Sequence, residues 1–296
     1  MGRVLATADI GSNTAHLLIA ELGRTNLKRM VNESEWLSLG EVVSREGCIP
    51  KEAEDRLVET LTRFKRLADG AKAQSLYVFA TEAMRRASNC DDVLKRIKKE
   101  CGIEVDIVSP RREAELGLRG ALQDTKPTNP VLMIETGGGS VQAAYCHNNV
   151  ITEEVSLRIG TGVLIAKSNL QFPAAKPMVN KIKSVVDEAL EALNIMPPAA
   201  SAIACGGVAR GIWRALHPDG EKTIFRKELE FLAWDTQRLS EEQIVARYSV
   251  KPKRAQTLLP GSLIYLAMLE KIGIDEITVS QYGVREGAVM EIAGQK

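Results

Sequence analysis

The chain carries two short glycine-containing turns, each of which joins two apolar, strand-like runs. The first lies in "RVLATADIGSNTAHLLIAEL" and the second in "VLMIETGGGSVQAAY". Residues 9–14, DIGSNT, can be laid on residues 135–140, ETGGGS, and each begins with an acidic residue. Because each turn heads a strand–turn–strand unit in its own half of the chain, the pair predicts two duplicated domains that face a common cleft.

Strand-like and helical runs alternate along the chain. Residues 51–69 carry apolar side chains every three or four positions, a spacing typical of an amphipathic helix. Strands are expected near 4–10, 16–22, 27–36, 75–80, 103–109, 131–136, 140–146, 150–157, 201–205 and 275–281, and helices near 51–69, 90–101, 109–122, 159–169, 177–194, 254–273 and 284–294. This alternation predicts an α/β fold.

The segment "QDTKPTNP", residues 123–130, is polar and contains two prolines, as domain linkers often do. A chain of 296 residues is long enough for two domains of ordinary size. We therefore expect an N-terminal domain over 1–124 and a C-terminal domain over 125–296.

Composition excludes several classes of partner. A net charge of +1 gives no general attraction to nucleic acid or membranes, and 4% aromatic residues are too few for base-stacking platforms. The five cysteines are odd in number and never spaced as C-x-x-C, which is typical of reduced thiols. With no expected secretion signal and no apolar run near the roughly 20 residues of a membrane helix, the sequence predicts a cytoplasmic protein with no nucleic-acid or membrane partner.

The two glycine turns are predicted to bind phosphate. A turn without side chains lets backbone N–H groups converge on an anion, and Ser or Asn side chains at its rim add donors. The candidate residues are Ser12, Asn13, Gly137, Gly138, Gly139 and Ser140. The alternative is a pair of tight hairpins whose glycines supply positive φ angles.

Two further features accompany the turns. Asp9 and Glu135 stand just before them, and a carboxylate beside a phosphate calls for a metal ion or an activated water between the two. In "ACGGVARGIWR", Gly206 and Gly207 lie between a strand and a helix, where helix N-terminal amides can bind an anion.

The chain resembles the exopolyphosphatase/guanosine pentaphosphate phosphohydrolase (Ppx/GppA) family of the actin-like ATPase superfamily. The resemblance runs through "ADIGSNTAHLLIA", "ATEAMRRASN", "SPRREAELGLRG", "ETGGGS", "SLRIGTG", "ACGGVA", "LLPGSLIYLAML" and "VSQYGVREGAV". It implies two ribonuclease H-like (actin-like ATPase) domains flanking an interdomain cleft, with the last helix, about 283–293, packing back on the N-terminal domain. It also implies Mg²⁺-assisted hydrolysis of a phosphoanhydride, with Mn²⁺ as the alternative ion.

The resemblance implies roles for particular residues. Glu113 matches the glutamate that activates water, and Arg85 and Arg254 match arginines that bind the phosphate chain. Asp9 and Glu135 match the carboxylates that hold the metal ion.

The chain also departs from the family pattern. An aspartate is replaced by the longer Glu135, two acidic residues are replaced by Gln142 and Gln281, and the first glutamate of the catalytic pair is replaced by Arg112. Losing acids weakens the capture of a hard dication and favours a bare polyanion. The metal half of the site is therefore expected to be the weaker half.

The leading hypothesis is a hydrolase that removes terminal orthophosphate from inorganic polyphosphate. The alternatives are a guanosine pentaphosphate 5′-phosphohydrolase and a non-catalytic sensor of polyphosphate or of a guanosine tetra- or pentaphosphate alarmone of the stringent response. An actin-like kinase or ATPase is a third option that rests only on the shared superfamily turns. The sequence leaves the subunit count open, a homodimer included.

Overall fold

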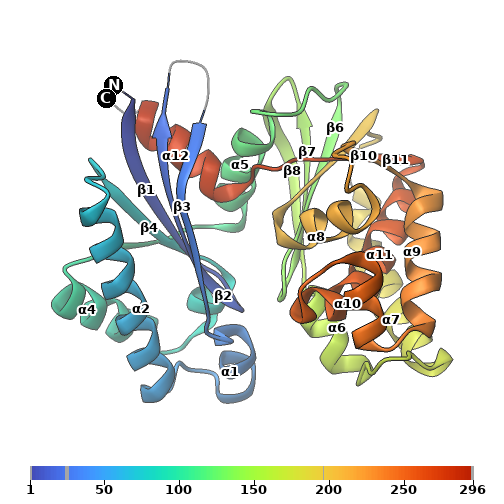
Figure 1. Cartoon of the computed structure of the whole chain (residues 1–296), viewed down its shortest axis with the longest axis horizontal. Coiled ribbons are helices and arrows are strands. Elements are labelled where there is room, and N and C mark those ends of the chain that lie inside the picture. Colours follow the sequence, from blue (N-terminus) through green and yellow to red (C-terminus); the bar gives the residue numbers. More distant parts are fainter. Residues whose placement is uncertain (1, 24–26, 196, 295–296) are drawn as a thin grey trace. The chain divides into compact units, whose positions relative to one another are not determined.

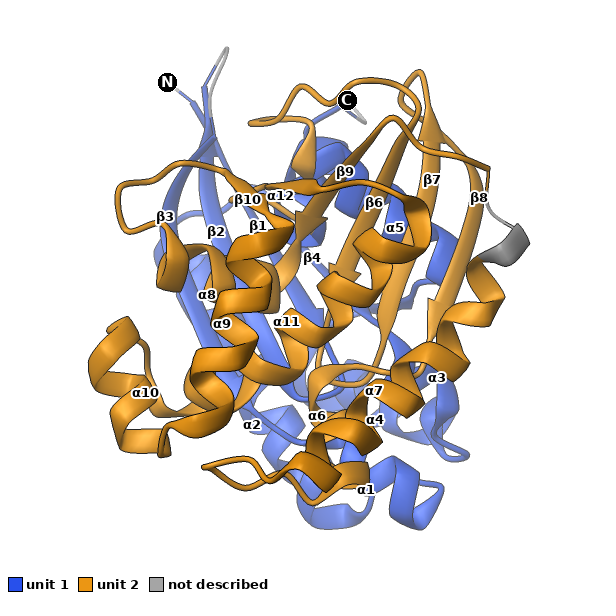
Figure 2. Cartoon of the chain, turned by 90° about the vertical axis from the view of Figure 1, so that its right-hand side faces the viewer, with its two compact units in different colours: residues 1–120, 284–296 blue, residues 121–283 orange. Residues whose placement is uncertain are grey.

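The computed structural model describes residues 2–23, 27–195 and 197–294. The chain divides into two compact units (Figure 2): unit 1 comprises residues 1–120 and 284–296, and unit 2 comprises residues 121–283. The division thus lies at 120/121, where the sequence predicted 124/125, and the last segment of the chain belongs to unit 1.

Unit 1 contains a five-stranded sheet in the order β3-β2-β1-β4-β5. Its strands are β1 (Arg3–Ile10), β2 (Thr14–Leu22), β3 (Leu27–Trp36), β4 (Leu76–Ala80) and β5 (Val105–Ile107). β1, β2 and β3 form an antiparallel meander, whereas β4 pairs parallel with β1 and with β5. The carboxyl ends of β1, β4 and β5 therefore meet at one edge of the sheet.

Helices cover both faces of the unit 1 sheet (Figure 1). They are α1 (Leu39–Glu46), α2 (Lys51–Gly70), α3 (Glu82–Arg86), α4 (Cys90–Cys101), α5 (Pro110–Ala121) and α12 (Val284–Gly294). Side chains alternate along β1, so Ala6, Ala8 and Ile10 pack with α2 and α4. Leu5 points the other way, toward Val289 of α12.

Gly287 of α12 lies against the backbone of α5. A Cβ built there would come within 1.8 Å of the Leu116 carbonyl oxygen. Gly287→Ala is expected to lower the free energy of unfolding by about 3 kcal/mol, because two backbones would have to separate. Urea unfolding measures this change. Gly294→Ala, in the same helix with nothing within 4 Å, is the control, and equal midpoints for the two variants would contradict the close approach.

Unit 2 contains a six-stranded sheet in the order β10-β11-β9-β6-β7-β8. Its strands are β6 (Val131–Thr136), β7 (Val141–His147), β8 (Val150–Leu157), β9 (Ser201–Cys205), β10 (Thr223–Phe225) and β11 (Glu276–Val279). Again the first three strands form an antiparallel meander, and the fourth pairs parallel with the first. The duplication predicted from the two turns therefore extends to the strand order of both sheets.

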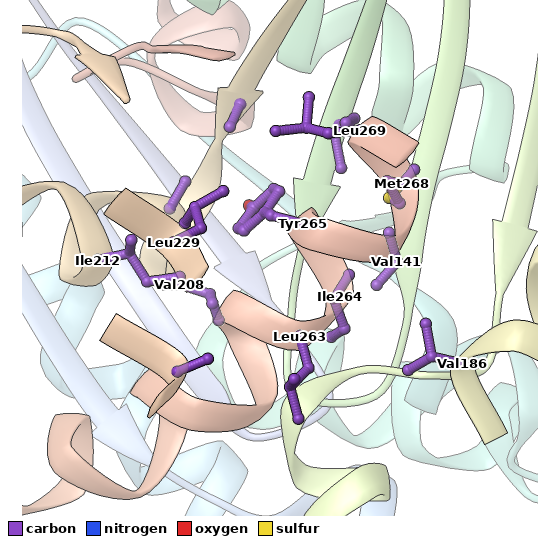
Figure 3. Packing of buried hydrophobic residues seen from close by; sticks show 14 of the residues in the cluster. Val141, Val186, Val208, Ile212, Leu229, Leu263, Ile264, Tyr265, Met268 and Leu269 are labelled. Atoms are coloured by element: carbon purple, nitrogen blue, oxygen red, sulfur yellow. The ribbon is translucent and has the colours of Figure 1, made fainter. Parts of the chain in front are cut away.

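The helices of unit 2 are α6 (Thr161–Ser168), α7 (Lys176–Leu190), α8 (Gly206–Leu216), α9 (Arg226–Arg238), α10 (Glu241–Tyr248) and α11 (Pro252–Ile272), with a 3₁₀ helix over Glu191–Ile195. Their apolar side chains form one core with one face of the sheet, as Figure 3 shows for Val141 of β7, Val208 of α8 and Ile264 of α11. On β6, Leu132 and Ile134 belong to this core. Glu135, between Ile134 and Thr136, points to the opposite face.

Five elements had no counterpart in the sequence prediction: α1, α3, β10, α9 and α10. In α9, Phe231 and Trp234 are exposed beside buried Leu232 and Ala233, so the apolar stripe is not confined to one face. The helix expected at 177–194 ends at Leu190 and continues as the 3₁₀ helix. Among the described residues, no helix combines the length and the apolar composition that crossing a membrane requires.

Asp235 of α9 connects α9 to α10. Its fully buried carboxylate accepts a hydrogen bond from the Tyr248 hydroxyl at 2.7 Å and pairs with Arg238 at 2.8 Å and Arg247 at 2.7 Å. Burial alone would raise the pKa of this carboxyl, but the hydrogen bonds from Arg238 and Tyr248 and the charge of Arg247 outweigh burial and lower it. The ionised form therefore stabilises the fold.

Asp235→Asn is expected to lower the free energy of unfolding at pH 7 by about 2 kcal/mol. A lowered pKa gives stability that is present above the unfolded-state pKa near 4 and is lost as the pH falls through the folded value. The difference in free energy of unfolding between Asp235→Asn and the unchanged protein should therefore shrink below about pH 4. Urea titrations across this pH range test it, with exposed Asp275→Asn as the control. A gap that stays constant with pH would refute the ionic role.

Candidate functional site

The turn after β1 is held by backbone hydrogen bonds that leave its central amides unused. Gly11 N–H donates to Thr14 O at 3.1 Å, which closes the turn. The Ser12 carbonyl accepts from Gly40 N–H at 2.6 Å, and the Asn13 carbonyl accepts from Leu37 N–H at 2.8 Å. Because these carbonyls face the segment that leads into α1, the N–H groups of Ser12 and Asn13 remain available to a ligand.

The turn after β6 repeats this arrangement in unit 2. Gly137 N–H donates to Ser140 O at 2.9 Å. The Gly138 carbonyl accepts from Gly162 N–H at 2.9 Å, and the Gly139 carbonyl accepts from Gly160 N–H at 3.2 Å, at the start of α6. The amides of Gly138 and Gly139 are thus left in the position that Ser12 and Asn13 occupy in unit 1.

Both turns are tight hairpins, but their glycines do not supply positive φ angles. None of Gly11, Gly137, Gly138 and Gly139 is among the described glycines with a positive φ angle. Glycine is therefore not needed there for its backbone conformation. Its absent side chain instead leaves the amides open to close approach by an anion, as the phosphate interpretation requires.

Gly40 and Gly160 are the residues of this arrangement that sequence reasoning missed. A Cβ at Gly40 would lie 2.7 Å from the Ser12 Cβ, and a Cβ at Gly160 would lie 2.4 Å from the Gly138 carbonyl carbon. Each glycine lets a helix N-terminal segment touch the turn that precedes it in sequence. In the sequence, their signal is a glycine just before or at the start of a helix in each half of the chain.

Asp9 lies on β1, and its position differs from that of an ordinary surface acid. Its Oδ1 atom is buried and has no hydrogen-bond partner. Burial raises the pKa of this carboxyl to about 6, although the charge of Arg285 partly opposes the shift. A bound cation would favour the ionised form and would satisfy the buried oxygen.

Glu135 has a different neighbourhood in unit 2. It pairs across the sheet with Gln142 of β7, so the two side chains share a face. The Gln142 side chain is buried, and neither atom of its amide has a hydrogen-bond partner in the described structure. Gly206, which directly follows β9, has a φ angle of 88°. A Cβ built on this glycine would lie 3.3 Å from Glu135 Cγ.

The acidic residues fit a hard dication only in part. Among residues 2–23, 27–195 and 197–294, no group of three or more His, Cys, Asp or Glu side chains is arranged to hold a metal ion. The bare, buried oxygen of Asp9 does suit Mg²⁺, which keeps several waters and takes ligands from phosphate. The predicted ligands Asp9 and Glu135 therefore stay a prediction.

Glu113 pairs with Arg85 at the carboxyl end of the unit 1 sheet. Ser109 caps α5 by accepting from Arg112 N–H at 3.1 Å, as the sequence predicts, and this places Glu113 in the first turn of the helix. Glu113 Oε2 lies 3.4 Å from Arg85 Nη1 and 3.5 Å from Nη2. Arg85 Nη1 also donates to the Val108 carbonyl at 2.5 Å.

This edge of the sheet brings together residues far apart in sequence. Thr81 N–H, before α3, donates to the Ile10 carbonyl at 3.1 Å, and Val108 N–H donates to the Ala80 carbonyl at 3.1 Å. The glycine turn, α3 with Arg85 and α5 with Glu113 thus follow the adjacent ends of β1, β4 and β5. Ligand sites in α/β sheets commonly lie at this edge.

Two neighbours of the site have roles that differ from expectation. The Ser12 hydroxyl, predicted to bind phosphate, donates to Glu82 Oε2 at 3.0 Å, so only its amide is available. Glu82 also pairs with Arg86 at 3.2 Å. Arg112 forms an ion pair with Glu291 of α12, so its charge is used to hold that helix.

The predicted site residues fall into two groups. Unit 1 holds Asp9, Ser12, Asn13, Arg85 and Glu113, and unit 2 holds Glu135, Gly137, Gly138, Gly139, Ser140, Gly206, Gly207 and Arg254. In unit 2, the guanidinium of Arg254 lies against Gly207, at the N-terminus of α8. That the two groups face one cleft stays a prediction.

Known proteins resemble this chain over nearly its whole length. Residues 18–296 match the Ppx/GppA phosphatase family. Exopolyphosphatase 1 of Mycobacterium leprae is 25% identical over 303 residues, which cover 97% of this chain and 88% of that protein. A crystal structure of the Aquifex aeolicus Ppx/GppA family member has a TM-score of 0.86 at 25% identity, and one of an exopolyphosphatase from Cytophaga hutchinsonii has 0.85 at 26%; each match covers 99% of both chains.

These matches decide two of the predictions. The α/β fold class with two ribonuclease H-like (actin-like ATPase) domains is confirmed by the structures and by the two sheets described above. The prediction of a phosphatase is confirmed at the level of the family. The chain belongs to the Ppx/GppA phosphatase family.

Proposed function

We propose that the protein is an exopolyphosphatase, which removes terminal orthophosphate from inorganic polyphosphate. The observation that carries the proposal is the Arg85–Glu113 pair at the carboxyl edge of the unit 1 sheet, where the open amides of the glycine turn also lie. A carboxylate that can accept a proton, a guanidinium and free amides are the groups that water attack on a phosphoanhydride requires. The names of the relatives in Mycobacterium leprae and Cytophaga hutchinsonii support the same substrate.

The chemistry follows from the residues of unit 1. Glu113 accepts a proton from water as the water oxygen bonds to the terminal phosphorus. The bond from that phosphorus to the bridging oxygen breaks, and the products are orthophosphate and a chain one phosphate shorter. Arg85 and the amides of Ser12 and Asn13 donate to phosphoryl oxygens and stabilise their charge.

The Arg85–Glu113 contact suits a guanidinium that changes partners. Its separations of 3.4 and 3.5 Å exceed the roughly 2.7–2.9 Å of a strong charged hydrogen bond. Both side chains are more than four-fifths buried, and this burial strengthens the attraction of the Arg85 guanidinium for a bound anion. The Arg85 guanidinium can therefore donate its hydrogen bonds to phosphate oxygens, while the Glu113 carboxylate accepts a hydrogen bond from the attacking water.

A Mg²⁺ ion, with Mn²⁺ as the alternative, would neutralise charge on the phosphate oxygens when bound. Asp9 is the unit 1 residue that would hold it, because its buried Oδ1 has no protein partner. Glu135 is the residue of unit 2 assigned to the same ion by the resemblance.

The direct test is phosphate release by the full-length chain from long-chain polyphosphate and from guanosine pentaphosphate, each with EDTA, Mg²⁺ or Mn²⁺. We expect release of orthophosphate from polyphosphate that rises with the divalent ion. A higher kcat/KM with guanosine pentaphosphate would replace the proposed substrate. No release from either substrate with either ion would contradict hydrolysis altogether.

A second candidate, binding without turnover, is favoured by Gln142. The neutral amide stands opposite Glu135, where the resemblance places an acidic metal ligand. Calorimetry with polyphosphate and with guanosine tetraphosphate, run beside the release assay, separates the candidates. Submicromolar binding with no turnover over hours would establish the sensor, and turnover would exclude it.

A further inference from the structure

The N-terminal turn of α8, in unit 2, gathers positive charge. Arg254 of α11 runs along α8, as its distances to two glycines show: a Cβ at Gly211 would lie 3.3 Å from Arg254 Cδ, and a Cβ at Gly207 would lie 2.9 Å from Nη2. α8 and α11 lie side by side (Figure 1). The two glycines, one helical turn apart, therefore form a channel that directs the guanidinium to the helix N-terminus.

Arg210 returns to the same turn from within α8. Its Nη1 lies 3.8 Å from the Cβ position of Gly283, and Gly206 N lies 3.7 Å from that same position. Nη1 is also 3.5 Å from the Gln281 carbonyl, a weak contact for a guanidinium. The absent side chain of Gly283 thus leaves a small space between Arg210 and the first amide of α8.

These groups repel one another. The N-terminus of a helix carries partial positive charge, so two guanidinium groups beside it are unfavourable without an anion. Burial lowers the pKa of Arg254, and the charges of Arg210 and Arg214 lower it further. Neither Arg210 nor Arg254 has an acidic ion-pair partner among the described residues. A bound polyanion would relieve this repulsion.

A second buried group of unit 2 also lacks a partner. The Gln142 amide is 4% exposed and makes no hydrogen bond, and it lies across the sheet from Glu135. Glu135 in turn abuts Gly206 through its Cγ. An uncompensated buried amide costs free energy, so its presence on the same sheet face as Glu135 indicates that a polar ligand or water completes this region.

We infer that Arg210 joins Arg254 and the Gly206 and Gly207 amides to hold an internal phosphate group of a condensed phosphate chain, and that Gly211 keeps the path of Arg254 open. This inference rests on the proposed polyphosphate substrate and adds a residue that determines specificity. Two guanidinium groups at one turn can bind an internal phosphate and the phosphoryl group next to it. Each guanidinium can donate two parallel hydrogen bonds to phosphate oxygens. A single orthophosphate can engage them only in part.

The test is calorimetric binding of sodium tripolyphosphate and of orthophosphate to the full-length chain in EDTA, at several salt concentrations. Arg210→Gln is expected to weaken tripolyphosphate binding roughly 10-fold or more. The slope of log K against log salt concentration should also become shallower by about one, because one positive charge is removed from the site. Orthophosphate binding should change less. Lys227→Gln, which removes an exposed charge from α9, is the control and should leave both affinities unchanged.

Further variants separate this inference from the proposed function. The affinity loss in the double variant Arg210→Gln/Arg254→Gln should be smaller than the sum of the single losses, and Arg210→Lys should recover part of the affinity. Arg210→Gln should raise the KM for polyphosphate more than it lowers kcat. If Arg210→Gln binds tripolyphosphate as Lys227→Gln does, the inference is overturned even when the enzyme turns over. If the loss is seen in a protein without turnover, the inference stands and the proposed activity fails.

Discussion

Glu113→Gln is expected to lower kcat for phosphate release from polyphosphate by roughly 10²–10⁴-fold. The amide keeps the shape of the carboxylate but cannot accept the proton that water loses during attack on phosphorus. Because the amide can still accept a hydrogen bond from Arg85, binding should be preserved and the KM should change little. Steady-state orthophosphate release at saturating polyphosphate and Mg²⁺ measures the effect.

The matched control is Glu115→Gln, two positions along the same helix. Glu115 is partly exposed and pairs with Arg111 and Arg112, so its loss should leave kcat within about twofold. Equal rates for Glu113→Gln and the unchanged protein would remove Glu113 from the mechanism. A loss of similar size in Glu115→Gln would point instead to a disturbance of α5.

Arg85→Gln is expected to lower kcat/KM by roughly 10²–10³-fold, because the site loses both a phosphate ligand and the charge that faces the transition state. The buried carboxylate of Glu113 would also lose its cationic neighbour, and the Val108 carbonyl would lose its donor. Both kcat and KM should therefore change, unlike in Glu113→Gln. Initial rates over a range of polyphosphate concentrations separate the two effects.

Arg85→Lys distinguishes charge from geometry. Lysine keeps the charge but cannot donate two parallel hydrogen bonds, so partial recovery is expected. Arg63→Gln, which removes an exposed arginine paired with Glu35, is the control for a general change in charge. If Arg85→Gln retains the full kcat/KM while Arg63→Gln does also, Arg85 does not bind the reacting phosphate.

The parts of the fold predicted from sequence are those with a local cause. The residues 51–69 show a regular apolar period, and α2 spans Lys51–Gly70. Ser109 and Pro110 mark the start of α5, and the cap hydrogen bond is present. Each of these features is decided within one or two turns of chain, so a single sequence carries enough information.

The parts that sequence reasoning missed depend on distant contacts. Gly40 and Gly160 are needed because a helix start touches a turn more than twenty residues earlier in the chain. Glu82, which takes the Ser12 hydroxyl, is 70 residues from Ser12. No spacing rule within a single sequence connects such pairs, because they meet only when strands that are distant in sequence align in the sheet.

The departures from the family pattern were visible in the sequence, but their surroundings were not. From the sequence, Arg112 is expected to reverse a charge on the lining of the predicted cleft, whereas the structure pairs it with Glu291 of α12. The sequence shows that Gln142 replaces an acid, but only the structure shows that it is buried and that it lies opposite Glu135. The residue type at a position can be read from the sequence directly, whereas its burial depends on which distant residues pack against it.

Unit 1 is assembled from two stretches of chain separated by the whole of unit 2. Leu5 and Leu18 on its sheet are covered by Val289 and Ala293, which lie near the end of the sequence. During translation, unit 2 can fold from one uninterrupted stretch, whereas the sheet of the first 120 residues lacks its covering helix until the whole of unit 2 has been synthesised. The nascent protein therefore exposes an apolar sheet face while unit 2 is being made, and the unit that carries the proposed general base is completed after the other.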